Sequence, residues 1–182
     1  GWDHRPTALA PPVARPFVPG TVTEVHPQAR AFIASLAQRL VRGLALFIDY
    51  GFPEAEYYPP QRTGGTLMCH RAQRSDTDPL ADVGDKDISA HVNFSAIALV
   101  AQDAGFEVLG YTSQAHFLIN CGLPPLVDAA RERGDWPAVA AAQKLIAEHE
   151  MGELFKVIAV GRGLGAGFVP LGFAQGDRMH RL

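Results

Sequence analysis

Residues 44–71 read LALFIDYGFPEAEYYPPQRTGGTLMCHR, and this stretch determines the fold expected for the chain. It begins with five consecutive apolar residues, 44–48, a run typical of a strand that is covered on both faces in a parallel sheet. Asp49 ends the run. In open α/β sheets, ligands bind beyond the carboxyl ends of the strands. Asp49, Tyr50 and the long loop after them are therefore predicted to lie where the chemistry is done.

Composition restricts the class of protein. The chain has 182 residues, enough for one substantial domain with a full core. A net charge of -3 provides no basic surface for nucleic acid, and no apolar run approaches the roughly 20 residues of a membrane span. Cys69 and Cys121 are far apart and lack a CxxC partner, which favours unpaired thiols in a reducing compartment. We expect a cytoplasmic protein that binds neither nucleic acid nor membrane.

The hydrophobic pattern predicts alternating helices and strands. Helices are expected at 27–42 and 94–104, the second capped by Asn93, and strands at 44–50, 106–112 and 154–160. Several short helices are expected between the last two strands, among them one capped by Ser113 and one from Trp136 to about Glu150. The expected organisation is a single domain portion with four consecutive parts: a proline-rich arm (1–25), a helix-strand-loop-helix-strand core (26–112), a helical insertion (113–150), and the last strand with a tail (151–182).

Three common catalytic patterns are absent or incomplete. The glycine-rich segment 161–167 fits GxGxxA, but a phosphate site needs a helix directly after the glycines, and Pro170 leaves no room for one. A flexible turn is the favoured interpretation. The spacings of Cys69, His70, His91 and Cys121 match no zinc pattern, so no metal site is predicted. No GxSxG elbow supports a serine nucleophile.

The loop after Asp49 carries acidic, aromatic and basic side chains in a short span. Its Gly64-Gly65 pair would allow the backbone to approach a ligand closely. A solvated surface loop is the alternative, but the aromatic residues argue against disorder. His91 precedes the second predicted helix, where it could accept a proton, orient a substrate, or serve only as a structural histidine.

Five blocks of sequence resemble the MidA-like family of S-adenosylmethionine-dependent methyltransferases. They are IDYG (48–51), EYYPPQRTGGTLMCHR (56–71), DISAHVNF (87–94), GYTSQAHFLINCGL (110–123) and MGELFKVIAVGRG (151–163). The blocks occur in the correct order and cover nearly the whole chain. The family includes a mitochondrial protein-arginine methyltransferase needed for complex I assembly.

This resemblance implies the carboxyl-terminal part of a class I, Rossmann-like α/β sheet. Residues 44–50, 106–112 and 154–160 would be its fifth, sixth and antiparallel seventh strands, with a helical insertion before the last. The family's cofactor loop belongs to an N-terminal half that has no counterpart in this sequence. The resemblance therefore implies that S-adenosyl-L-methionine is bound mainly by that half, that this chain supplies no cofactor-binding residue and is inactive alone, and that the complementary half is its partner. Homo-oligomer formation is left open.

The resemblance also implies a protein arginine side chain as the methyl acceptor. Acidic and aromatic groups would hold its guanidinium group and orient one nitrogen. The candidate catalytic residues are Asp49, Tyr50 and His91, and the candidate substrate-binding residues are Tyr57, Tyr58, Arg62, Thr66 and Asn93. The alternative function is a non-catalytic protein-interaction module that retains half of a methyltransferase fold.

Overall fold

The computed structural model describes residues 3, 5–8 and 12–182, which form two compact units. The first unit comprises Gly1–His26 and Tyr58–His91, and the second comprises Pro27–Tyr57 and Val92–Leu182. Six residues of the predicted proline-rich arm, at positions 1, 2, 4 and 9–11, lie outside the described residues. The predicted division into four consecutive parts stays a prediction.

A mixed four-stranded sheet forms the centre of the second unit. Its strands are β1 (Gly43–Phe52), β5 (Val92–Asn93), β6 (Glu107–Ser113) and β7 (Phe155–Arg162), in the order β5-β1-β7-β6. β7 runs antiparallel to both β1 and β6, and β1 pairs with β5 in parallel. The predicted α/β class with an antiparallel last strand is confirmed, and the structure places β7 between β1 and β6.

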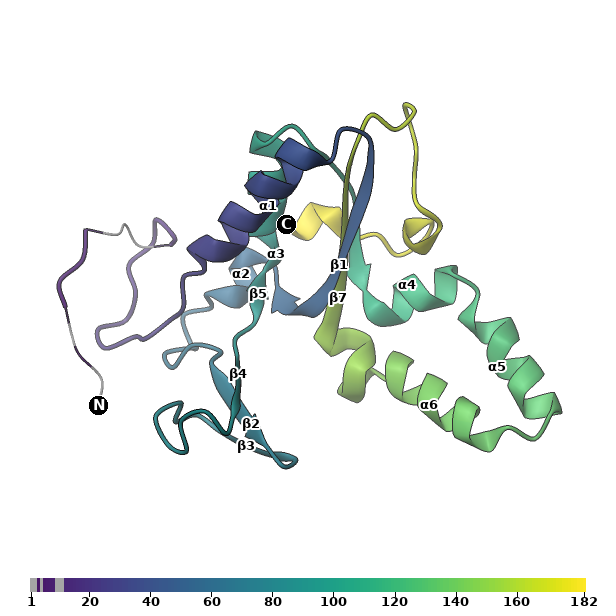
Figure 1. Ribbon diagram of the computed structural model, residues 1–182, viewed down its shortest axis with the longest axis horizontal. Helices are drawn as coiled ribbons and strands as arrows, with labels where there is room; N and C mark the ends of the chain where they lie inside the picture. Colours follow the sequence, from purple (N-terminus) through teal and green to yellow (C-terminus); the bar gives the residue numbers. More distant parts are fainter. Residues whose placement is uncertain (1–2, 4, 9–11) are drawn as a thin grey trace. The chain divides into compact units, whose positions relative to one another are not determined.

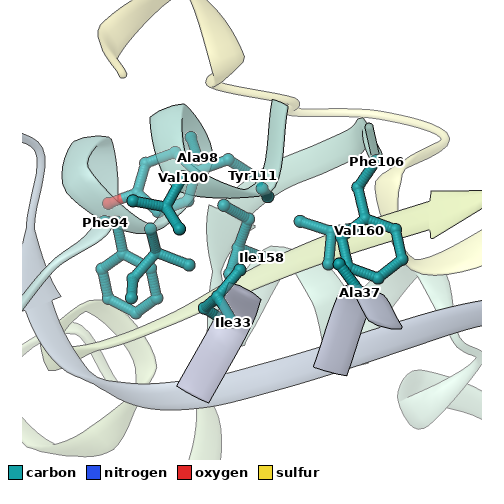
Figure 2. Close-up of a cluster of buried hydrophobic side chains, with 11 residues drawn as sticks. Ile33, Ala37, Phe94, Ala98, Val100, Phe106, Tyr111, Ile158 and Val160 are labelled. Atoms are coloured by element: carbon teal, nitrogen blue, oxygen red, sulfur yellow. The ribbon is translucent and has the colours of Figure 1, made fainter. Parts of the chain in front are cut away.

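Helices α1 (Pro27–Arg39) and α3 (Phe94–Asp103) lie on one side of this sheet (Figure 1). The Asn93 side chain accepts a hydrogen bond from the Ala96 amide at 3.0 Å, so Asn93 caps α3 as predicted. Figure 2 shows how the two helices and strands β6 and β7 share one core. Its labelled members are Ile33, Ala37, Phe94, Ala98, Val100, Phe106, Tyr111, Ile158 and Val160.

A smaller apolar cluster covers the opposite side of the sheet. Val157 and Ala159 of β7 pack there against Leu109 of β6 and Phe173 of the 3₁₀ turn η2 (Leu171–Phe173). Helix α4 (Gln114–Asn120), capped by Ser113 as predicted, contributes Phe117. The predicted helical insertion continues as α5 (Leu123–Glu132) and α6 (Trp136–Ile146), which lie side by side and extend away from the sheet (Figure 1).

Helix α6 is shorter than predicted. We expected a helix to about residue 150, but the backbone turns extended at Ala147 (ψ 132°) and closes in a π turn, η1 (Glu148–Gly152). A side chain at Gly152 would overlap the backbone of Ile146 and Ala147. The helix therefore ends early because the chain at Gly152 packs directly against the backbone of the last helical turn, a contact that the helical periodicity does not indicate.

The prediction that residues 44–48 are covered on both faces is wrong. Exposure alternates along β1, with Leu44, Leu46 and Ile48 between 39% and 46% exposed. These three side chains share the face on which Val157 and Ala159 are covered, but that cluster draws on β6, β7, α4 and η2 and does not extend over β1. In the part of the chain that the structure describes, one face of β1 is open.

The first unit contains a small antiparallel sheet, and the sequence analysis missed its first two strands. Strands β2 (Met68–Arg71), β3 (Arg74–Asp76) and β4 (Asp87–Ser89) pair in the order β3-β2-β4. Ala72 and Gln73 form the β2–β3 turn with positive φ angles of 47° and 63°. Hairpin turns of this type usually carry Asn-Gly or Asp-Gly, so the Ala-Gln sequence did not indicate a hairpin.

In the second unit, a short helix, α2 (Glu54–Tyr57), replaces part of the loop expected after Asp49.

Candidate functional site

Asp49 and Tyr50 lie near the carboxyl end of β1, as predicted. The exposed Asp49 carboxylate accepts a hydrogen bond from the Tyr50 amide at 2.8 Å. Tyr50 packs on Phe155 across the β1–β7 pair, with ring centroids 4.1 Å apart. Because successive residues of a strand point to opposite faces, the two side chains diverge, and only Tyr50 belongs to the open face of β1.

A buried charge lies opposite Asp49 in the strand register. Lys156 of β7 is 5% exposed, and its Nζ lies 3.2 Å from the Glu153 carboxylate, which Arg178 also reaches at 2.6 Å. Burial opposes ionisation of Glu153, yet the hydrogen bonds and charges of Arg178 and Lys156 hold its pKa below the ordinary value. Sequence analysis missed this group; a lysine inside the otherwise apolar run 155–160 was the available signal.

Tyr111 is a second group that sequence analysis missed. It is 1% exposed, and its hydroxyl has no hydrogen-bond partner among the described residues. Burial, with a contribution from Glu56, raises the pKa of Tyr111 far above its ordinary value, so the phenol stays protonated. Residues 177 and 178 of the C-terminal tail hydrogen-bond to the backbone of β6 at Tyr111. The Tyr111 amide donates to the Asp177 carboxylate at 2.9 Å, and the Tyr111 carbonyl accepts from the Arg178 amide at 2.6 Å.

Two of the predicted substrate-binding residues, Tyr57 and Asn93, belong to the second unit and contribute there to its packing and helix capping. Tyr57 is buried at the end of α2, and the side-chain oxygen of Asn93 accepts the α3 capping bond. Beside α2, a cavity of about 480 Å³ is lined by residues of α2, α3, β6 and the tail, among them Glu54, Ser95, Gln102 and Arg181. Arg181 forms an ion pair with Glu56 at 2.7 Å, which fixes the tail against α2.

The other four predicted residues, Tyr58, Arg62, Thr66 and His91, belong to the first unit. Thr66 is buried, and its hydroxyl accepts a hydrogen bond from the His91 amide at 3.0 Å. Tyr58 is buried as well and donates its hydroxyl to the Glu24 carbonyl at 3.4 Å. Arg62 is half-buried on the same loop. The structure thus brings Tyr58, Thr66 and His91 together around Glu24, a residue that sequence analysis did not single out.

The glycine-rich segment does not build a nucleotide site. Residues 163–170 follow β7 as turn and coil, and the next helical element, η2, has only three residues. No helix therefore opens directly after Gly167, as predicted, so this segment has no helix N-terminus whose amide groups would hold a phosphate. The segment consequently does not fit the dinucleotide site that the motif suggested.

Two further absences apply to the described residues only. Within residues 3, 5–8 and 12–182, no three histidine, cysteine or acidic side chains converge to hold a metal ion. None of the helices formed by these described residues combines the length and apolarity that a membrane span requires.

Comparisons with known proteins agree on one family. Residues 2–112 match the family model described as "Putative S-adenosyl-L-methionine-dependent methyltransferase". A crystal structure of a Burkholderia thailandensis superfamily member bound to S-adenosyl-homocysteine is 50% identical, with a TM-score of 0.84, and the match covers 90% of this chain and 42% of that one. No curated protein matches the chain.

A native crystal structure of an uncharacterized protein of the same superfamily, also from Burkholderia thailandensis, gives a similar result. It too is 50% identical with a TM-score of 0.84, over 89% of this chain and 44% of that one. The chain therefore spans less than half of the length of these solved relatives. The family match extends over more than half of the chain, and the chain belongs to this family of S-adenosyl-L-methionine-dependent methyltransferases.

Proposed function

We propose that this chain is the acceptor-side part of a MidA-like methyltransferase that transfers a methyl group from S-adenosyl-L-methionine to a protein arginine. The observation that carries the proposal is the open side of β1, because it lies on the strand that bears Asp49. The remainder of a longer polypeptide, the complementary N-terminal half, would cover this side and hold the cofactor. A cytoplasmic location remains part of the proposal.

The open side of β1 comprises an edge and a face. Among the described residues, β1 pairs on its outer edge only through Gly51 and Phe52, so no described strand pairs with the edge along residues 43–49. Leu44, Leu46 and Ile48 expose apolar surface beside it. An unpaired edge flanked by apolar side chains favours the addition of a further strand and a covering layer.

The chemistry requires positioning more than a protein nucleophile. S-adenosyl-L-methionine, when bound, supplies an activated methyl group for in-line displacement. The residues of this chain would hold the acceptor and orient one guanidinium nitrogen. Asp49 offers an exposed carboxylate for the cation, and Tyr50, 42% exposed, offers a ring face on the opposite side of β1 at the same end of the strand.

The remaining candidate residues support the acceptor site less directly. In the second unit, Tyr57 is buried and would support helix α2. In the first unit, Tyr58 and Thr66 are buried and would support the loop that carries the half-buried Arg62, and His91 is half-buried as well. Asn93 would set the start of α3. We assign no general base.

Cofactor binding tests the division of labour. Calorimetry with S-adenosyl-homocysteine is expected to show no binding to the 182-residue chain and binding of one equivalent to a full-length polypeptide that contains it. Tight binding by the 182 residues alone would contradict the placement of the cofactor site in the other half. Binding by neither polypeptide would favour a non-catalytic interaction module.

Acceptor positioning is tested at Asp49. In the full-length polypeptide, Asp49→Asn is expected to lower kcat/KM for an arginine-rich peptide about 100-fold, because a neutral amide no longer holds the guanidinium cation. Its affinity for S-adenosyl-homocysteine should stay unchanged. Asp103→Asn is the matched control, since Asp103 is an exposed carboxylate at the far end of α3. Equal activity of the two variants would remove Asp49 from the acceptor site.

A further inference from the structure

The Glu24 carboxylate fastens the glycine-containing loop of the first unit. Its Oε1 accepts hydrogen bonds from the amides of Thr66 and Leu67, both at 2.8 Å, and its Oε2 accepts the Thr66 hydroxyl at 3.2 Å. A carboxylate that receives two adjacent backbone amides and a hydroxyl forms charge-assisted bonds, which are stronger than neutral ones. One side chain from the start of the chain thus determines the path of residues 65–67.

Gly65 is matched to this contact. Its φ of +73° lies in the left-handed region, which glycine adopts without strain. A Cβ atom at this position would also overlap the Glu24 carboxylate. The glycine pair was expected to let a ligand approach the backbone closely. In the structure, the Glu24 side chain of the same chain makes this approach at Gly65.

The contact continues from Glu24 to the predicted site residues. The Thr66 hydroxyl that donates to Glu24 also accepts from the His91 amide at 3.0 Å. Tyr58 donates to the Glu24 carbonyl, and the Val22 amide donates to the Thr63 carbonyl at 2.9 Å, so the backbone at Glu24 and just before it is also bonded to residues 58–63. Removing the carboxylate would therefore allow both the loop backbone and His91 to move.

We propose that Glu24 is a positioning residue of the acceptor site, acting through Thr66 on His91 and the 62–67 loop. The proposal rests on the proposed function, since it is this acceptor loop that Glu24 holds. Glu24 itself need not contact the methyl acceptor. Its carboxylate is committed to the loop by three hydrogen bonds, which makes it a support for the site and not a ligand within it.

Two substitutions at Glu24 separate positioning from simple stability. Glu24→Ala removes all three bonds. Glu24→Gln keeps the shape: its amide oxygen can accept both backbone amides, and its nitrogen can donate to the Thr66 oxygen. In the full-length polypeptide, Glu24→Ala is expected to raise KM for an arginine-rich peptide about tenfold without changing the affinity for S-adenosyl-homocysteine, and Glu24→Gln should restore most of the loss.

Amide hydrogen exchange measures the same effect without an acceptor. Exchange at Thr66, Leu67 and His91 should accelerate at least tenfold in Glu24→Ala and little in Glu24→Gln, because the carboxylate no longer protects the loop. Unchanged exchange in Glu24→Ala would overturn the proposal. So would faster exchange with unchanged peptide KM, because Glu24 would then be a structural fastening only.

The two proposals fail in different ways. If the wild-type polypeptide binds S-adenosyl-homocysteine but does not methylate the arginine-rich peptide, the arginine assignment is wrong. The exchange experiment still decides whether Glu24 holds the loop and His91. If the wild-type polypeptide methylates the peptide and Glu24→Ala does so with the same KM, the assignment of arginine stands and the role of Glu24 is wrong.

Discussion

Strands β1 and β7 carry similar apolar runs, LALFI and VIAV, but only β7 is covered on both faces. Val157, Ile158, Ala159 and Val160 of β7 are all 0% exposed, whereas Ile48 of β1, directly opposite Val157, is 46% exposed. One α1–α3 layer covers the inner face of both strands. On the other face, the cluster around Phe173 reaches β7 and stops.

An apolar strand therefore indicates that both of its faces need to be packed against other elements. It does not indicate whether those elements belong to the same chain. The β1 run is consistent with a two-sided core that is complete only when another layer is present. The chain matches 42% and 44% of the length of its solved relatives. Three experiments would break or sharpen this interpretation of β1.

The largest effect is expected from a pair of isoleucine truncations in the full-length polypeptide. Ile158→Ala removes part of a fully buried core side chain and should lower the free energy of unfolding by about 4 kcal/mol. Ile48→Ala should cost about 3 kcal/mol if the remainder of the polypeptide covers β1. Urea unfolding measures both. As a control, truncating the 81% exposed Val41 to alanine should cost less than about 0.5 kcal/mol. A similarly small cost for Ile48→Ala would show that the face stays open.

A charge on the open face of β1 should affect the isolated chain and the full-length polypeptide differently. In the isolated 182-residue chain, Leu46→Lys should reduce self-association, because it places an ammonium group on the exposed apolar face. In the full-length polypeptide it should destabilise by about 3 kcal/mol, since the charge would be buried. Light scattering and urea unfolding measure the two effects.

Leu126→Lys on α5 is the matched control for that experiment. Leu126 is also exposed, at 67%, but lies on the helical insertion and not on the sheet. This variant should change neither association nor stability. A wild-type chain that is already a monodisperse monomer would contradict the expected association.

A smaller effect is expected at the start of β7. Glu153→Gln leaves the buried Lys156 without its carboxylate partner and should cost about 2 kcal/mol at pH 7. Because the pKa of Glu153 is lowered in the folded state, the stability it contributes is present above its ordinary value of 4.5 and is lost as pH falls through the lowered value. The difference between wild type and variant, measured by thermal unfolding, should therefore shrink on acidification below about pH 4.5. Glu148→Gln, at an exposed position one turn earlier, should change stability by less than about 0.5 kcal/mol.

The sequence alone determined the elements whose signals are local. The stripe of α1, the caps of α3 and α4 by Asn93 and Ser113, and the mixed sheet follow from periodicity, cap chemistry and resemblance to a family. Asp49 was placed near the carboxyl end of a strand for the same reason. The stripe, the two caps and the end of the strand depend on residues within a few positions of one another, so a linear pattern contains them. The mixed sheet pairs residues far apart in the chain and was expected only from the resemblance.

Only the tertiary structure decided the polar contacts and the uneven covering of the sheet. Glu24 and Thr66 are 42 positions apart, and Glu153 and Arg178 are 25 apart, so no spacing rule pairs them. The open face of β1 depends on which helices and turns the chain folds over each strand, and apolarity cannot report that. Local geometry is encoded by neighbouring residues, whereas burial and ion pairing are set by distant segments that meet only in the folded chain.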